Sequence, residues 1–325
     1  MQNVIGIDVS KETLVVCHAP GDKDQHLEVS NNKAGFQRLL KSCGGTDRLY
    51  VMEATGAYYM QLAYFLHSQG AAVAVINPVV IKRFVQMHLG KGKSDKKDAQ
   101  WIMRYGQQNQ VKQWQPETPL LVECRQLEQA IEQLIKQKTM ISNSLEALER
   151  QPVKCLLVVR GLKQTSKLLQ RQIGHMEREL QDKMGSLFSI EMDLLVSIPG
   201  IGRKTAGMLL LFAGGFQQMA SYRQLIAKAG LCPREYTSGT SIRGKVRITK
   251  MGGSLIRSKL YMCSLTAMRG NAACKELYER LVARGKNGKV ALIAVCNKLL
   301  KQAFAIVKSG IPYQAEFSKT SPQFA

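Results

Sequence analysis

A long amphipathic stretch in the middle of the chain, residues 117–185, divides the sequence into three parts. Apolar side chains recur there every three to four residues among Glu, Gln and Lys: Leu120, Leu127, Ile131, Leu134, Ile141, Leu145 and Leu148. That spacing is typical of one face of a long α-helix, as in a coiled coil. Pro152 ends this helix, and a second one is expected from about residue 164 to 183. The chain therefore divides into residues 1–115, a helical coiled-coil or dimerisation arm at 116–190, and residues 191–325.

The first part alternates short apolar runs with helical spacing, which is typical of an α/β domain. We expect strands at residues 4–9, 13–17, 26–29, 49–52 and 71–76, and helices at residues 36–40 and 58–68. The last part, residues 191–325, is predicted to be a compact, mainly α domain. Its final helix is expected from about residue 290 to 308.

The charge of the chain is large and unevenly distributed. Lys and Arg number 46 against 24 Asp and Glu, a net charge of +22. Residues 191–325 alone hold 21 basic and 6 acidic residues. This asymmetry indicates a polyanionic partner, with nucleic acid favoured. A basic surface that only aids solubility is the plainer alternative.

Three further observations exclude other classes of protein. The sequence has no uninterrupted run of 18 apolar residues, so we expect no membrane-spanning helix. The first eleven residues reach Asp8 without a long apolar stretch, so no signal peptide is expected. The eight cysteines are scattered without a CxxC pair. They indicate reduced, mostly buried thiols in a cytoplasmic protein, and neither disulfides nor a zinc site.

Four carboxylates of the first part stand where metal chemistry would need them. Asp8 and Glu53 fall at the ends of two predicted strands. Asp95 and Asp98 follow Ser94, a good N-cap, so both lie on one face in the first turns of a helix. Together they match the ribonuclease H-like pattern and would hold two Mg²⁺ (or Mn²⁺) ions for phosphodiester displacement. Taken alone, Asp95 and Asp98 could equally be a solvated helix start.

The segment 198–202, Ile-Pro-Gly-Ile-Gly, resembles the turn of a helix-hairpin-helix motif. Backbone N–H groups of such a turn approach a phosphate, aided by the N-terminus of the following helix. Arg203 and Lys204 add positive charge there, so both are candidate nucleic-acid ligands without sequence preference. An ordinary Gly-rich turn between packed helices is the alternative.

The segment 231–245 gathers hydroxyls, glycines and basic residues in one loop. Gly239 to Lys245 nearly spells a phosphate-binding GxxxxGK loop, but Val246 replaces the required Ser or Thr, so we reject an ATPase. A serine here could be a phosphate ligand, a turn cap or a nucleophile, and no nearby His would activate it. Further basic residues of this region are candidate nucleic-acid ligands, in part on a predicted basic helix that could instead be structural: Arg243, Lys245, Arg247, Lys250 and Arg257.

Seven segments carry a resemblance to a known family, in the family's order and spacing: residues 5–11, 53–58, 75–78, 93–99, 198–202, 229–233 and 238–244. The sequence resembles the DEDD transposases of insertion sequences, the family that includes the pilin-gene invertase Piv. The resemblance implies a RuvC-like first domain in which Asp8, Glu53, Asp95 and Asp98 are the catalytic metal ligands. It also implies a transposase domain with a serine nucleophile, for which Ser238 matches and Ser241 is held in reserve.

The resemblance further implies the partners and the assembly. They are double-stranded donor and target DNA, a noncoding bridge RNA whose loops pair with both, and homodimers that assemble into tetramers with composite active sites. The function expected is Mg²⁺-dependent strand cleavage and exchange through a phosphoserine. Three alternatives stay open: a Piv-like invertase without a guide RNA, a metal-dependent junction nuclease, and a nonenzymatic nucleic-acid-binding protein.

Overall fold

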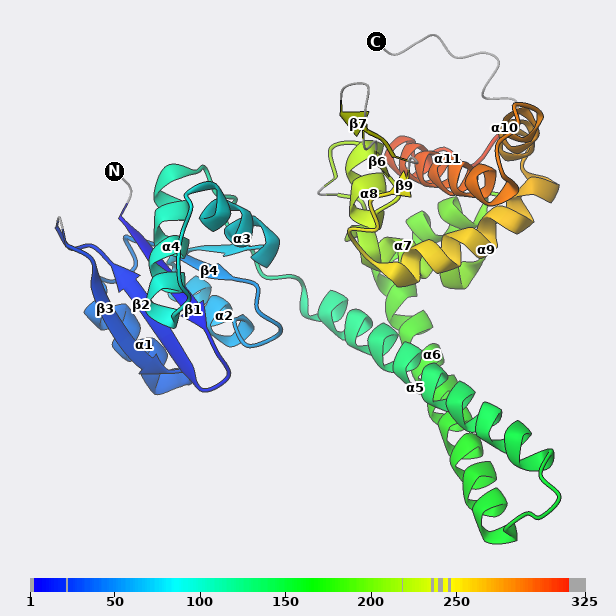
Figure 1. Ribbon diagram of the computed structural model, residues 1–325, viewed down its shortest axis with the longest axis horizontal. Coiled ribbons are helices and arrows are strands. Elements are labelled where there is room, and N and C mark those ends of the chain that lie inside the picture. The colour runs from blue at the N-terminus through cyan, green and yellow to red at the C-terminus, as the bar shows by residue number, and fades with distance from the viewer. Residues whose placement is uncertain are drawn as a thin grey trace. The chain divides into compact units, whose positions relative to one another are not determined.

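The computed structural model describes residues 3–21, 23–217, 219–234, 237–238, 242–244 and 247–315. The chain falls into two units, Met1–Glu117 and Thr118–Ala325, each with a hydrophobic core of its own. Figure 1 shows a mixed α/β first unit and a mostly helical second unit. The expected α/β and mainly α character of the two ends of the chain is confirmed.

The first unit is built on a five-stranded sheet of order β3-β2-β1-β4-β5. Its strands are β1 Val4–Val9, β2 Thr13–His18, β3 Gln25–Ser30, β4 Leu49–Glu53 and β5 Ala72–Ile76. β1, β2 and β3 pair antiparallel, whereas β1, β4 and β5 pair parallel. All five strands lie within two residues of the expected bounds, because each is a short apolar run flanked by turn residues.

Helices cover both faces of this sheet. Helices α1 (Lys33–Ser42) and α2 (Met60–Ser68) share a core with Ile5, Ile7 and Val9 of β1. Helices α3 (Pro78–Met87) and α4 (Asp95–Gln108) share the opposite core with Val4. Because side chains alternate along a strand, Asp8 lies on the same face as Val4 and Gly6, toward α4.

Helix α3 was not expected, since the sequence analysis placed only a strand, residues 71–76, in this region. Asn77 is the N-cap, and its side-chain oxygen accepts the Val79 N–H at 2.9 Å. Pro78 occupies the first helical position, where its fixed φ suits the helix and its missing N–H is not needed. The same dipeptide therefore ends β5 and begins α3.

The contact between α4 and β1 is unusually close because Gly6 has no side chain. A Cβ at position 6 would lie 2.2 Å from the Ala99 carbonyl oxygen and 2.3 Å from the Met103 backbone nitrogen. Gly106 plays the same part from the helix side, since a Cβ there would lie 2.7 Å from a methyl group of Val51. The two glycines let the backbone of α4 rest directly on the sheet.

In the second unit, α5 (Pro119–Glu149) and α6 (Leu156–Val196) form a long helical hairpin (Figure 1). Lys183 of α6 pairs with Glu123 of α5 at 2.8 Å. Helix α6 is longer than the predicted span of 164–183. The prediction missed its first turn because Leu156 and Leu157 there are exposed, so the amphipathic pattern is broken. At Phe188 the backbone of α6 leaves helical geometry, with φ −142° and ψ 40°.

In its described residues, the rest of the second unit is a helical domain with four very short strands. Its elements are α7 Arg203–Ala213, α8 Tyr222–Ala229, β6 Pro233–Arg234, β7 Thr237–Ser238, β8 Ile242–Arg243, β9 Arg247–Ile248, α9 Ser254–Gly270, α10 Ala272–Ala283 and α11 Gly288–Ser309. The predicted basic helix is corrected here. Arg247 lies in β9 and Lys250 in the turn after it, because Gly252 (φ +132°) and Gly253 delay the helix until Ser254.

Helix α11 is, within the described residues, the one helix long and apolar enough to cross a membrane, with a mean hydropathy of 1.7. The sequence analysis considered only uninterrupted apolar runs, so it did not single out this helix. Its residues Val295, Leu299 and Ala303 are fully buried in the core of the second unit. Core helices of this kind pass the same test, so α11 is accounted for by packing.

We expect Gly6→Ala to destabilise the first unit by about 3 kcal/mol, because the added Cβ forces α4 away from β1. Urea unfolding followed by tryptophan fluorescence measures this selectively, since Trp101 and Trp114, the two tryptophans of the chain, both belong to the first unit. The matched control is Gly21→Ala, whose Cβ would meet nothing within 4 Å. A wild-type unfolding midpoint for Gly6→Ala would contradict the close contact.

Candidate functional site

Two carboxylates reach one edge of the sheet because their strands run parallel. Asp8 is the penultimate residue of β1, and Glu53 is the last residue of β4. The register pairs Ile7 with Met52, so both acidic residues lie just beyond the last β1–β4 pair. Carboxyl ends of parallel strands are a common place for binding sites in α/β folds.

Helix α4 brings two more carboxylates to the same place. Ser94 caps its N-terminus, and the Ser94 Oγ accepts the Lys97 N–H at 3.3 Å. Asp95 and Asp98 occupy the first turn, where the helix dipole favours negative charge. Ile102, one turn after Asp98, is fully buried against the sheet, so the face that carries Asp98 is held over β1.

The structure brings three of the four predicted residues into one group. The carboxylate oxygens of Asp8, Asp95 and Asp98 lie within 4.8 Å of one another, and we call these residues the carboxylate cluster. Asp8 and Asp98 are half-buried, and Asp95 is exposed. Glu53 is outside this group but close enough to interact electrostatically with Asp8 and Asp98.

The electrostatics of the site are repulsive. Burial, followed by the charges of Asp98, Asp95 and Glu53, raises the pKa of Asp8 to about 6. Burial and the Asp98 charge raise the pKa of Glu53, and burial also raises that of Asp98. Carboxylates held this close are poised for a cation that would neutralise them.

The donor set of the carboxylate cluster fits a hard divalent cation. Mg²⁺ and Mn²⁺ prefer carboxylate oxygens and are commonly held by one or two of them, with the remaining ligands supplied by water or phosphate. The half-buried Asp8 faces the first turn of α4, and no basic side chain forms an ion pair with the cluster within the described residues. We therefore find the site compatible with a divalent metal.

Two neighbours of this site were missed by the sequence analysis. The positive charge of Lys93 lowers the pKa of Asp8, Glu53 and Asp98, so Lys93 is part of the electrostatic environment of the site. The Thr55 side chain hydrogen-bonds to Glu53 and lowers the pKa of that carboxyl. Lys93 stands two residues before Asp95 and Thr55 two after Glu53, so proximity in sequence was the available signal.

Ser238 belongs to the second unit. Its backbone lies in β7 and pairs with Ile242 of β8. Residues 235, 236, 239–241, 245 and 246, among them Ser241 and Lys245, lie outside the described residues. The side chains of Ser238 and Arg243 also lie outside them. The role of Ser238 as a nucleophile stays a prediction from the resemblance.

The turn 197–202 joins α6 to α7 and fits closely against α9. Gly200 has φ +103°, and a Cβ there would lie 2.9 Å from the Ala267 backbone nitrogen. Arg203 begins α7 and is exposed, with no ion-pair partner in the described part of the chain. Lys204 instead pairs with Glu177 of α6 at 2.6 Å. The two neighbours therefore differ in how freely they could meet a phosphate.

The other basic candidates are also placed differently from one another. Arg247 is exposed in β9. Lys250 lies at φ +54°, and its backbone N–H donates to the Gly230 carbonyl at 3.0 Å. Arg257 donates to the carbonyl oxygens of Ala229 and Gly252 at 3.0 and 3.1 Å. Arg257 thus holds the loop before α9 in place, whichever partner it also contacts.

Two family models match the chain. DEDD_Tnp_IS110, described as "Transposase", matches residues 5–151, which include all four carboxylates. The second, described as "Transposase IS116/IS110/IS902 family", matches residues 192–279, which include Ser238. Together the two matches cover more than two thirds of the chain.

The chain is also similar along most of its length to several characterised proteins. It is 29% identical over 321 residues to the pilin gene-inverting protein of Moraxella lacunata, covering 95% of this chain and 97% of that protein. It is 24% identical to the transposase for insertion sequence element IS1328 of Yersinia enterocolitica, covering 95% and 98%. The transposase for IS1111A of Coxiella burnetii is 23% identical, covering 91% and 86%.

The repulsion within the cluster predicts that Asp8→Asn stabilises the metal-free protein at pH 7.5. The pKa of Asp8 is about 6 in the folded state against an ordinary 3.8, so the folded protein holds this proton more tightly. The stability that this proton contributes is present below pH 4 and is lost as the pH rises through about 6. We expect a gain of about 1 kcal/mol after solvent screening, shrinking toward zero at pH 4.5.

Urea unfolding in EDTA, followed by tryptophan fluorescence, measures this gain. Asp47→Asn is the control, because Asp47 is an exposed carboxylate before β4, at the opposite end of that strand from Glu53. An Asp8→Asn protein less stable than wild type at pH 7.5 would contradict the repulsion.

Proposed function

The chain belongs to the IS110 family of transposases, enzymes that cleave and rejoin DNA, and we propose that it mobilises an insertion sequence through a phosphoserine intermediate. The observation that carries the proposal is the carboxylate cluster at the edge of the sheet. Its site residues would be Asp8, Glu53, Asp95 and Asp98 with Ser238. It would act in the cytoplasm on double-stranded donor and target DNA.

Asp8, Asp95 and Asp98 would hold Mg²⁺ or Mn²⁺, with Glu53 nearby. The bound cation would supply Lewis-acid stabilisation to the scissile phosphate. Lys93, whose charge acts on the same carboxylates, would contact a non-bridging phosphate oxygen and keep the strand oriented. Without a cation, the raised pKa of Asp8 leaves this carboxyl about half protonated near pH 6, so protons would compete with the metal below that pH.

Ser238 would act as the nucleophile. Its Oγ would form a bond to the scissile phosphorus as the bond to one deoxyribose oxygen breaks. The serine proton would leave to solvent, and the leaving deoxyribose oxygen would take a proton from solvent and become a hydroxyl. The DNA end would then be held as a phosphoserine, and attack by a second strand's hydroxyl would reverse the step. One phosphodiester is exchanged for another, so no ATP is needed. Arg243 and Lys245 would neutralise the charge of the transition state.

The second unit would supply the backbone contacts to nucleic acid. Residues 191–325 carry most of the net charge, and the candidates are Arg203, Lys204, Arg243, Lys245, Arg247, Lys250 and Arg257. Residues 197–202 would act as a helix-hairpin-helix turn that binds phosphate. Base pairing with a bridge RNA would read the DNA sequence, while the protein would hold the backbones.

The helical hairpin of α5 and α6 would join protomers into homodimers that assemble into tetramers. Its far half exposes large apolar side chains: Met140, Val153, Leu156, Leu157 and Leu168. Exposed apolar groups in such number favour a protein partner.

Two other functions remain candidates. The likeness to proteins that invert a pilin gene favours a site-specific invertase that needs no guide RNA. A metal-dependent junction nuclease would use the carboxylate cluster alone and would leave Ser238 as a phosphate ligand.

The decisive experiment is a search for a covalent adduct. Protein, Mg²⁺, labelled donor and target DNA, and RNA transcribed from the flanks of the gene are mixed and run on a denaturing gel. We expect a shifted protein–DNA band with wild type and none with Ser238→Ala or Asp8→Ala. Ser241→Ala is the matched control and should keep the band.

Each other outcome of this experiment selects a different function. Cleavage without an adduct in both wild type and Ser238→Ala would favour the junction nuclease. An adduct that forms without RNA would favour the invertase.

Arg203 and Lys204 provide a second test, by titration of a labelled DNA duplex at several salt concentrations. We expect Arg203→Ala to reduce the slope of log affinity against log salt by about 1. Lys204→Ala should reduce it less, because Glu177 already pairs with that lysine. The control is Lys41→Ala, which removes an exposed charge from the first unit. An equal or larger effect at Lys204 would contradict this reading of the turn.

A further inference from the structure

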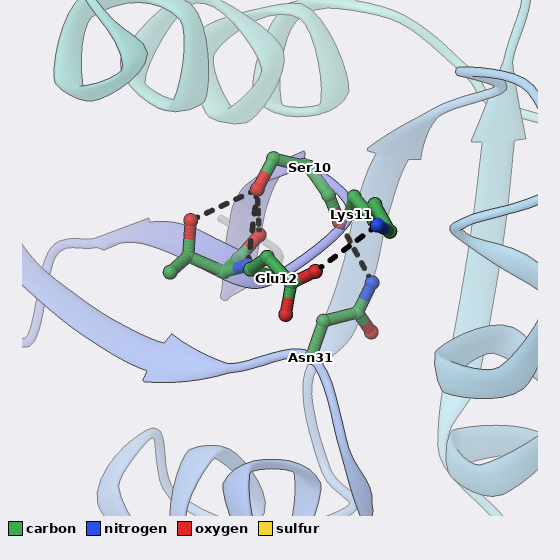
Figure 2. Close-up of polar contacts among 5 residues, drawn as sticks. Ser10, Lys11, Glu12 and Asn31 are labelled. Carbon is green, nitrogen blue, oxygen red and sulfur yellow. Dashed lines mark hydrogen bonds and ion pairs between the residues drawn. The ribbon is translucent and has the colours of Figure 1, made fainter.

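Asn31, between β3 and α1, bridges two loops that are distant in sequence. Its side-chain nitrogen donates to the Ser10 carbonyl oxygen at 2.8 Å and to the Tyr58 carbonyl oxygen at 3.2 Å. Its backbone N–H donates to the Glu12 carbonyl at 2.9 Å. Figure 2 shows the amide nitrogen of Asn31 pointing at the Ser10–Glu12 turn.

The two bridged loops are the ones that follow the strand carboxylates. Ser10 comes two residues after Asp8, and Tyr58 comes five residues after Glu53. The β1–β4 register ends at the pair of Ile7 with Met52, before either carboxylate. The Asn31 amide therefore joins the segments that leave β1 and β4 where the ladder between these strands has stopped.

The other polar contacts of this turn do not make that connection. Ser10 Oγ donates to the Thr13 carbonyl at 2.8 Å and accepts the Thr13 N–H at 3.0 Å, which closes the turn upon itself. The Lys11–Glu12 ion pair, at 3.5 Å, joins two highly exposed side chains of the same turn (Figure 2). Neither contact reaches the loop after Glu53.

The Asn31 amide makes its hydrogen bonds through its nitrogen. Its Oδ1 is buried and has no hydrogen-bond partner in the described residues. Turning the amide over would place this oxygen against the two carbonyls, so the observed orientation is the one that bonds. Unpaired buried acceptors are uncommon in folded proteins, and each calls for an explanation. The two donated bonds to the carboxylate-bearing loops provide one.

We propose that Asn31 is a positioning residue that sets the spacing between Asp8 and Glu53 for the binding of a divalent cation. The proposal rests on the proposed function, because it assumes that these carboxylates hold the metal. Asn31 does not contact the metal. Its two hydrogen bonds hold the loops that follow Asp8 and Glu53, much as residues that hydrogen-bond to metal ligands orient those ligands in other sites.

The test is Mn²⁺ binding to the full-length protein, measured by electron paramagnetic resonance of the free ion. Asn31→Ala should weaken Mn²⁺ binding about tenfold. Asn31→Leu, which is branched at Cγ like Asn but has no donor, should do the same and serves as the second variant should Asn31→Ala fail to fold. The matched control is Asn32→Ala, which removes the N-cap bond from Gly35 to Asn32 Oδ1, 3.0 Å long, and leaves both loops tied.

Two results would overturn the proposal. One is wild-type Mn²⁺ affinity in both Asn31 variants. The other is an equal loss of affinity in Asn32→Ala, since the effect would then follow general stability.

Failure of the proposed function would be visible separately, as Mn²⁺ binding by wild type that Asp8→Asn does not reduce. In that case, hydrogen exchange in EDTA tests whether Asn31 connects the two loops. Faster exchange at residues 10–13 and 54–59 in Asn31→Ala, with the change in Asn32→Ala confined to α1, would support the bridge. Unchanged exchange in these loops would overturn it.

Discussion

The direct contact between the backbone of α4 and strand β1 is the constraint on which the first unit depends. Because Gly6 lacks a side chain, Ala99 and Met103 of the helix approach the strand more closely than any other residue would allow. This contact fixes the height of α4 above the sheet and so brings Asp95 and Asp98 to Asp8. A glycine two residues before an acidic strand end is thus part of the site, although it carries no functional group.

The site that this contact assembles works against the stability of the fold. Burial and three neighbouring negative charges raise the pKa of Asp8, and the cation of Lys93 offsets only part of the repulsion. Functional sites often hold groups in arrangements that an isolated fold would avoid. The close packing of α4, its Ser94 cap and the buried face around Ala99 supply the stability that tolerates this arrangement.

Much of this could be predicted from the sequence, and the misses have identifiable causes. The strands of the first unit are short apolar runs between turns, and all were located. Asp8, Asp95 and Asp98 stood out because one lies in an apolar strand and two follow an N-cap.

Helix α3 was missed because Asn77-Pro78 can both end a strand and begin a helix. Asn31 was missed because its partners, Ser10 and Tyr58, are more than twenty residues away in the sequence. Ser238 emerged from family resemblance, since its loop has no local chemical signature of a nucleophile.

The break in α6 at Phe188 has a mechanical consequence. The side chain of Phe188 is buried in the core of the second unit and lies against Gly215, where a Cβ would come within 2.6 Å of the ring. From there to Leu156 the helix runs for about 48 Å at 1.5 Å per residue. A rotation of about 5° at the break would move the far end of the hairpin by about 4 Å. The packing of the Phe188 ring in the core therefore sets the direction of the hairpin. Substitutions around Gly215 would change the position of the far end of the hairpin without contacting it.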